Sequence, residues 1–162
     1  MKKSTIAVIA ILVVLAIGVA VLAVLNSQNA EEKKQQLADE YLYIHVGGVE
    51  YKITLEEFLS FEQQEFEANY KKNNLAPESR TFAGVPFAEI LRAKGIAPAG
   101  FGSAVFAAAD SYAQALSMAD ALDEENCFIV YDDGADGPFR MILPKDQFSQ
   151  RWVKLLTDIT LK

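Results

Sequence analysis

Two cationic residues near the C-terminus stand where they could hold an anionic ligand. Arg140 lies in the run 137–145, Gly-Pro-Phe-Arg-Met-Ile-Leu-Pro-Lys, which predicts a turn, a short apolar strand and a proline stop. Lys154 follows shortly after, at the start of a second apolar run. Strands that deliver a guanidinium and an ammonium group to the edge of a core suit a phosphate or carboxylate.

A structural role is favoured over ligand binding for Arg140, because arginine–carboxylate pairs commonly stabilise folds and an acidic surface disfavours anions. Arg140 could pair with a carboxylate such as Asp110 or Asp158 and so pin two strands together. Asp110 and Tyr112, on either side of Ser111, could line a cleft, or they could cap a turn and half-bury on a strand.

Several kinds of chemistry find no support in the sequence. One cysteine and one histidine are too few for a Cys/His metal cluster, and no nucleophile motif indicates a Ser/His/Asp triad. Cys127 lies in an apolar run and is expected to be a core residue. His45 alternates with apolar residues, so we expect it to face solvent or a neighbouring strand. The run 132–143 faintly resembles a calcium loop, but its last position is Leu143 where a glutamate is required.

The pattern of the remaining residues predicts an α+β fold of short strands mixed with three short helices. Gly47-Gly48 is typical of a hairpin turn, and Thr54 with Glu57 forms a capping box. Ser117 is expected to cap a short helix that runs to Leu122. Pro86 is expected to open a helix that Gly95 closes. The expected strands are 41–46, 49–53, 65–70, 80–85, 104–109, 112–116, 127–131, 139–143 and 153–161. The continuous apolar run 104–109 predicts a strand buried on both faces.

The N-terminus has the composition of a membrane anchor. Ile6 to Leu25 is an apolar run of 20 residues preceded by Lys2 and Lys3. Such a run is long enough to cross a bilayer and longer than an ordinary signal-peptide core. We therefore expect residues 1–25 to form a retained signal anchor, residues 26–40 a polar tether, and residues 41–162 an extracytoplasmic domain. Cleavage after the run would instead give a secreted domain.

The net charge of the chain beyond its apolar segment limits the kinds of partner that it can bind. Beyond residue 30 the chain carries 13 basic and 22 acidic residues, a formal charge of −9. An acidic surface repels phosphate backbones, so nucleic acid is excluded as a partner.

The order of these motifs resembles the oxidoreductase molybdopterin-binding domain of the sulfite oxidase type, in its small bacterial secreted or membrane-anchored form. The resemblance spans roughly residues 41 to 162. It rests on the hairpin at 46–49 with 54–57, on Phe-Ala-Gly-Val-Pro-Phe at 82–87 with the helix after it, on Ala-Asp-Ser-Tyr at 109–112, on the run 137–144 and on Trp-Val-Lys at 152–154. It implies a mixed, barrel-like sheet with short helices, behind one transmembrane helix. It also implies Arg140, Lys154, Asp110 and Tyr112 as possible cofactor-binding residues.

The chain departs from this family at the position of the metal-binding cysteine. The resemblance implies a cysteine ligand for molybdenum in the loop after the third strand, where this sequence has Asn69-Tyr70-Lys71-Lys72-Asn73-Asn74. Ser111 and Lys145 also stand where the family has glycine. We therefore expect a binding or interaction module that engages a protein partner or a small anionic ligand. A molybdopterin-dependent oxidoreductase and a small-ligand or haem-type carrier using His45 stay open as alternatives.

Overall fold

The computed structural model describes residues 3–71, 76–132 and 137–162, with side chains from Leu12 onward. The chain divides into two units, one formed by the residues up to Gln35 and one by Gln36–Lys162. Positions 72–74 of the expected metal-ligand loop and 133–136 of the possible calcium loop lie outside the described residues.

A single helix, α1 (Lys3–Ala38), makes up the first unit and the start of the second. It is long and apolar enough to cross a membrane, with a mean hydropathy of 1.9 in its most apolar window. Its large apolar side chains are exposed; Val14, for example, is 68% accessible. The predicted tether is thus helical as far as Ala38. Gln36 is buried, and its Nε2 donates to the carbonyl of Thr157.

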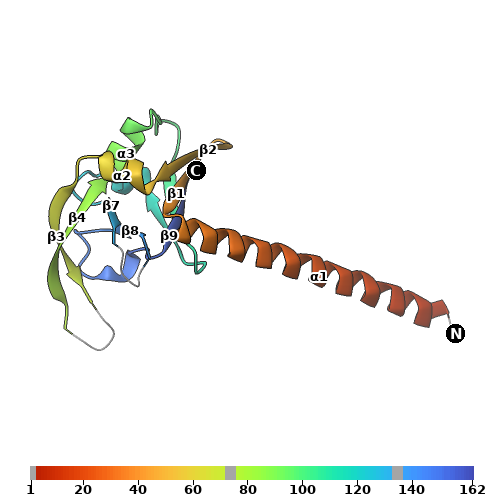
Figure 1. Ribbon diagram of the computed structural model, residues 1–162. Helices are drawn as coiled ribbons and strands as arrows, with labels where there is room; N and C mark the ends of the chain where they lie inside the picture. The colour runs from red at the N-terminus through yellow and green to blue at the C-terminus, as the bar shows by residue number, and fades with distance from the viewer. Residues whose placement is uncertain (1–2, 72–75, 133–136) are drawn as a thin grey trace. The chain divides into compact units, whose positions relative to one another are not determined.

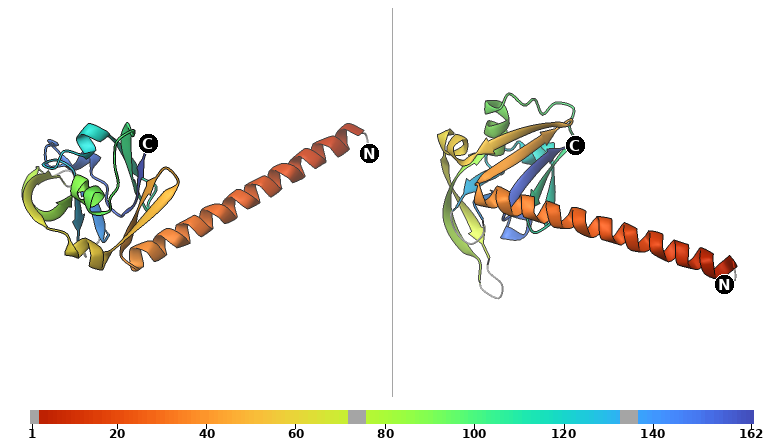
Figure 2. Two further views of the ribbon diagram at one scale, coloured as in Figure 1. Left: turned by 90° about the horizontal axis from the view of Figure 1, so that it is seen from above. Right: turned by 45° about the vertical axis from the view of Figure 1, so that its right-hand side comes forward.

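The globular unit contains two sheets (Figure 1), which Figure 2 shows from two further sides. The five-stranded sheet has the order β2-β1-β9-β5-β6. Strand β1 runs parallel to β9, and the other neighbours are antiparallel. Its strands are β1 (Tyr41–Val46), β2 (Val49–Thr54), β5 (Ser103–Ala108), β6 (Ala113–Ser117) and β9 (Leu156–Leu161). Gly47 and Gly48 both have positive φ in the β1–β2 turn, which confirms the predicted hairpin.

The four-stranded sheet has the order β3-β4-β7-β8 and is antiparallel throughout. Its strands are β3 (Gln64–Tyr70), β4 (Glu78–Pro86), β7 (Phe128–Tyr131) and β8 (Phe139–Ile142). In Figure 1 the long β3–β4 hairpin forms one edge of the globular unit. Gly84 of β4 lies so close to β7 that a Cβ atom there would be 2.6 Å from the carbonyl oxygen of Ile129.

Short helices connect the strands. They are α2 (Leu55–Ser60), α3 (Phe87–Ala93), α4 (Met118–Ala121) and a 3₁₀ turn, η1 (Ser149–Arg151). The hydroxyls of Thr54 and Ser117 accept from the backbone N–H three residues on, as N-caps do, so both caps were predicted correctly. The combination of two sheets with short helices gives a mixed α/β protein. Closure into a barrel stays a prediction.

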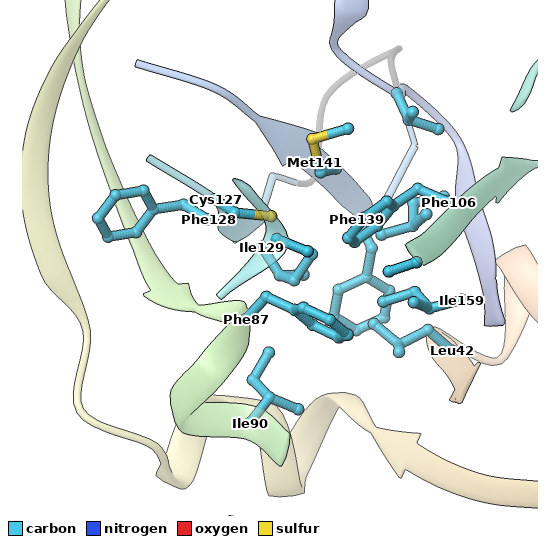
Figure 3. Packing of buried hydrophobic residues seen from close by; sticks show 14 of the residues in the cluster. Leu42, Phe87, Ile90, Phe106, Cys127, Phe128, Ile129, Phe139, Met141 and Ile159 are labelled. Atoms are coloured by element: carbon cyan, nitrogen blue, oxygen red, sulfur yellow. The ribbon is translucent and has the colours of Figure 1, made fainter. Parts of the chain in front are cut away.

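The core is built from both sheets and α3 (Figure 3). Phe87 of α3 meets Phe106 of β5 edge-on at 5.2 Å between ring centroids, and Phe58 meets Phe139 of β8 in the same way. Such edge-to-face pairs add to the stabilisation from apolar burial.

Three expectations were wrong in detail. Pro86 ends β4 and is the N-cap of α3 rather than its first residue, because its backbone is still extended, with a ψ of 134°, and it pairs with Phe128 of β7. The closing strand begins only at Leu156; Val153 makes an isolated bridge to Met141, and Leu155 has a φ of 51° that breaks the extended chain. Strand β5 is buried on one face only, since Val105 and Ala107 are half-exposed on the other.

Candidate functional site

The position that would supply a metal-ligating thiolate offers none. Strand β3 ends at Tyr70, and the sequence has no cysteine in the connection to β4. The single thiol, Cys127, is completely buried and lies among core side chains in Figure 3. Desolvation raises the pKa of this thiol far above its ordinary value, with further contributions from Asp123 and Asp120. A protonated, inaccessible thiol does not fit a molybdenum site.

Tyr70 is instead the centre of a cationic and aromatic cluster, which we call the Tyr70 cluster: Tyr70, Arg80, Arg140, Trp152 and Lys154. The guanidinium of Arg80 lies 4.7 Å from the Tyr70 ring centroid, and the ammonium of Lys154 lies 5.6 Å from it. The Trp152 ring centroid is 6.0 Å from that of Tyr70. Cations over an aromatic face are stabilised by its quadrupole.

Arg140 is the buried member of this cluster. Its side chain is 8% exposed, and its Nη2 pairs with Oδ2 of Asp132 at the end of β7. Burial lowers the pKa of the guanidinium, and Arg80 lowers it further while Tyr70 opposes the shift. The carboxylate partner is thus Asp132, not the Asp110 or Asp158 considered from the sequence. The buried Arg140 and its carboxylate thus form an ion pair of the kind that holds neighbouring segments of a fold together.

Of the four expected cofactor-binding residues, Lys154 thus lies at the Tyr70 ring, and Arg140 is near enough to Tyr70 and Arg80 for both to shift the pKa of its guanidinium. The other two lie in the β5–β6 turn of the five-stranded sheet. Asp110 accepts a hydrogen bond from the Tyr112 backbone N–H at 3.0 Å, and the Tyr112 hydroxyl donates to the Gln150 carbonyl at 3.2 Å. These contacts are those of a capped turn.

Sequence reasoning missed Tyr70 and Arg80. In the β3–β4 register Arg80 is opposite Ala68, and Glu78 is opposite Tyr70, so Arg80 reaches the tyrosine diagonally. This proximity depends on the register of a long hairpin, which local composition does not fix. The alternation of polar and apolar residues along β3 does indicate that Tyr70 lies on the same face of the strand as Phe66.

His45 is held between two carboxylates. Its Nε2 lies 2.9 Å from Oδ1 of Asp158, and its Nδ1 lies 3.5 Å from Oε2 of Glu50 on the neighbouring strand. The prediction that it faces a strand neighbour is confirmed. Both ring nitrogens thus lie beside carboxylates of the chain itself, an arrangement that favours a structural role over haem ligation. Among the described residues, no group of three or more His, Cys, Asp or Glu side chains is arranged to hold a metal ion.

A shallow groove lies beside α3. It has a volume of about 330 Å³ and is lined by Ala88, Leu91, Arg92, Ile96, Pro98, Leu122 and Glu124. Arg92 bridges Glu89 and Glu124 across its rim. The cation of the groove is thus already paired with acids of the chain itself.

Comparison with known proteins gives a relation at the level of fold. No family model matches the sequence, and no curated protein matches it. Among solved structures, the chain is similar to the sulfane dehydrogenase SoxCD from Paracoccus pantotrophus, with a TM-score of 0.61 and 17% sequence identity. The match covers 77% of this chain and 38% of that one. The globular unit therefore has, distantly, a sulfite-oxidase-like fold.

Proposed function

We propose that this chain is a membrane-anchored, extracytoplasmic binding module built on a sulfite-oxidase-like scaffold, without molybdenum redox chemistry. One observation carries the proposal: the sole thiol is sealed in the core, and the connection after β3 contains no cysteine. A scaffold of this type can keep its fold while its chemistry is lost, because activity resides in site residues and not in the architecture.

The Tyr70 cluster is the place where an anionic cofactor would be expected to bind, and its cations are already engaged within the chain. Arg140 pairs with Asp132, Lys154 lies over the Tyr70 ring, and Arg80 pairs with Glu78. The cluster is therefore stabilised by the chain's own groups. These residues would suit the anionic part of a pterin, but the chain supplies no thiolate for its metal.

Metal content tests the proposal directly. The full chain would be expressed in a host that synthesises molybdopterin, beside a molybdopterin enzyme as a positive control, and both would be analysed for molybdenum and for visible absorption. We expect the control to be loaded and this chain to be colourless, with far less than one molybdenum per chain. The Cys127→Ala variant should give the same result as the natural chain. Stoichiometric molybdenum in the natural chain would overturn the proposal and favour the oxidoreductase alternative.

A further inference from the structure

Strand β6 is an open edge of the five-stranded sheet. It pairs only with β5 in the sheet order, and the ladder is antiparallel. The bonds from Ala108 N–H to the Tyr112 carbonyl and from Met118 N–H to the Gly102 carbonyl fix which residues face β5. Because hydrogen-bonded and non-hydrogen-bonded pairs alternate, the peptide groups of Ala113, Ala115 and Ser117 point away from the sheet. The Gln114 side chain donates to the Ala115 carbonyl at 2.8 Å, as expected for an outward-facing group.

Charged side chains usually protect the edge strands of a sheet from pairing with other chains, and β6 has no such charge. Of the four outer strands in the described part of the chain, β2 carries Glu50 and Lys52, β3 carries Glu65 and Glu67, and β8 is bridged by Val153 at Met141. Strand β6 reads Ala-Gln-Ala-Leu-Ser, with neither a charge nor a proline. Natural sheets keep foreign strands off an edge with lysine, proline or bulges. An unprotected edge can accept an extended peptide as an additional strand.

The outer face next to this edge is also poorly covered. Val105 and Ala107 of β5 are half-exposed, and Ala113 and Ala115 of β6 are exposed on the same face. The sequence of β5 has the continuous apolar character of a strand buried on both faces. A bound strand at β6 would set its side chains beside Ala113 and Ala115 and so extend this apolar face.

Acidic residues mark both ends of the edge. Asp110 precedes β6 in the turn, and Asp120 follows it in α4; both are exposed. A strand added here would place its ends beside these two carboxylates. Charge complementarity therefore favours a segment that has basic residues on both sides of an uncharged stretch.

We propose that β6 binds an extended segment of a partner protein, with backbone hydrogen bonds to Ala113, Ala115 and Ser117 and basic side chains beside Asp110 and Asp120. The inference rests on the binding role proposed above and names its surface and partner. The incoming strand would replace the Gln114 side chain at the Ala115 carbonyl, exchanging one amide donor for another.

A second copy of this chain is a poor occupant of the same edge. Two β6 strands paired about Ala115 in antiparallel fashion would bring the turn that carries Asp110 in one copy towards the helix that carries Asp120 in the other, at both ends of the paired strands. Like charges brought together in this way repel each other. The remaining acidic surface adds repulsion between copies.

Peptide binding to the full chain in nanodiscs of zwitterionic lipid tests the inference. The probes are fluorescent peptides of about ten residues, enough to span the strand and reach both acids. Each has an alternating Val/Thr, Ile/Thr or Phe/Thr centre and either two lysines or two glutamates at each end. We expect members of the lysine set to bind, more weakly at high salt, and the glutamate set not to bind. Failure of the whole lysine set at millimolar concentration would overturn the inference.

Three variants locate the binding. Asp110→Asn with Asp120→Asn keeps the side-chain acceptors of both turns and should weaken lysine-flanked peptides by roughly threefold to tenfold. Glu62→Gln removes a charge from an exposed position elsewhere and should change affinity little. Ala115→Pro removes an outward N–H without touching the β5 ladder and should abolish binding. Equal binding by all variants, or concentration-dependent dimerisation through β6, would overturn the inference. The molybdenum assay described above does not depend on peptide binding. A failure of this inference can therefore be told apart from a failure of the proposed function.

Discussion

Ser111 is held in a backbone conformation that favours glycine. Its φ is 73°, in the turn that links β5 to β6, and the side chain is exposed. The left-handed region costs an ordinary residue about 1–2 kcal/mol. The family resemblance had placed a glycine at this position, and the geometry gives the reason.

We therefore expect Ser111→Gly to stabilise the protein by about 0.5–1 kcal/mol, since relief of strain exceeds the added entropy of the unfolded chain. Urea denaturation would measure the change. Ala119→Gly, at an exposed position inside α4, is the matched control and should destabilise by about 1 kcal/mol. A destabilised Ser111→Gly variant would contradict the strain argument.

The Arg140–Asp132 pair is asymmetric in its exposure. The arginine side chain is 8% exposed and the aspartate side chain 39%, so water can solvate the acid but scarcely the base. Removing the acid leaves a buried cation, whereas removing the base leaves an acid that water can reach.

The expected cost is about 3 kcal/mol for Asp132→Asn and about 1 kcal/mol for Arg140→Met, which retains much of the buried side-chain volume. The two midpoints of unfolding, measured side by side, would check the order. If Arg140→Met proved the more damaging change, the arginine would be doing more than balancing Asp132.

At the scale of elements, local signals predicted most strands and caps. The Gly47-Gly48 turn, the Thr54 and Ser117 caps and the apolar strand before Pro144 all depend on neighbours in sequence. The Tyr70 cluster was not predictable in the same way, because Tyr70, Arg80 and Lys154 meet only through hairpin register and strand order. The burial of β5 was also misjudged. The apolar composition of a strand shows that both of its faces could be buried, but it does not show whether other elements pack against both faces.

The contact between β4 and β7 explains the glycine at position 84. A Cβ there would lie 2.6 Å from the Ile129 carbonyl oxygen and 2.8 Å from a Val130 methyl group. Gly84→Ala should therefore destabilise the protein by about 3 kcal/mol through displacement of β7. Gly102→Ala is the control: its nearest neighbour would be the Lys162 carbonyl at 3.9 Å, and its cost should stay below about 1 kcal/mol. A melting-temperature comparison distinguishes the two, and equal effects would argue against close packing at Gly84.

Lys145 ties the end of β8 to the loop before β7. Its backbone N–H donates to Asn126 Oδ1 at 3.0 Å, and its ammonium lies 2.7 Å from the Asp123 carboxylate. The hydrogen bond from Lys145 lowers the pKa of Asp123, with help from the Glu125 backbone N–H.

A lowered carboxyl pKa stabilises the fold above the unfolded-state pKa, and this contribution is lost as pH falls through the folded-state value. Lys145→Met should therefore destabilise the protein slightly at neutral pH and have almost no effect once Asp123 is protonated in both states. Thermal unfolding of both proteins between neutral pH and about pH 2 would reveal this convergence. A difference in melting temperature that persisted at low pH would assign the effect to packing of the lysine stem.

At the scale of the whole molecule, charge and hydropathy divide the chain more sharply than any motif does. The apolar helix is followed by a globular unit rich in acids, while Lys2 and Lys3 precede the apolar run. Basic residues flanking a span tend to stay cytoplasmic, whereas acidic residues affect orientation little. An extracytoplasmic location would also place β6 and its acidic ends where an external partner could reach them.

Topology can be tested with a reporter enzyme, active only outside the cytoplasm, fused after Lys162. We expect a high signal for the natural sequence and a reduced one for Lys2→Gln with Lys3→Gln, because the cations that retain the N-terminus are gone. Lys33→Gln with Lys34→Gln removes two cations from the other side of the apolar run and serves as the control. That change should leave the signal equal or raise it, since positive charge on the translocated side opposes translocation. A reporter that was silent in the natural sequence and active after the Lys2 and Lys3 changes would place the globular unit in the cytoplasm.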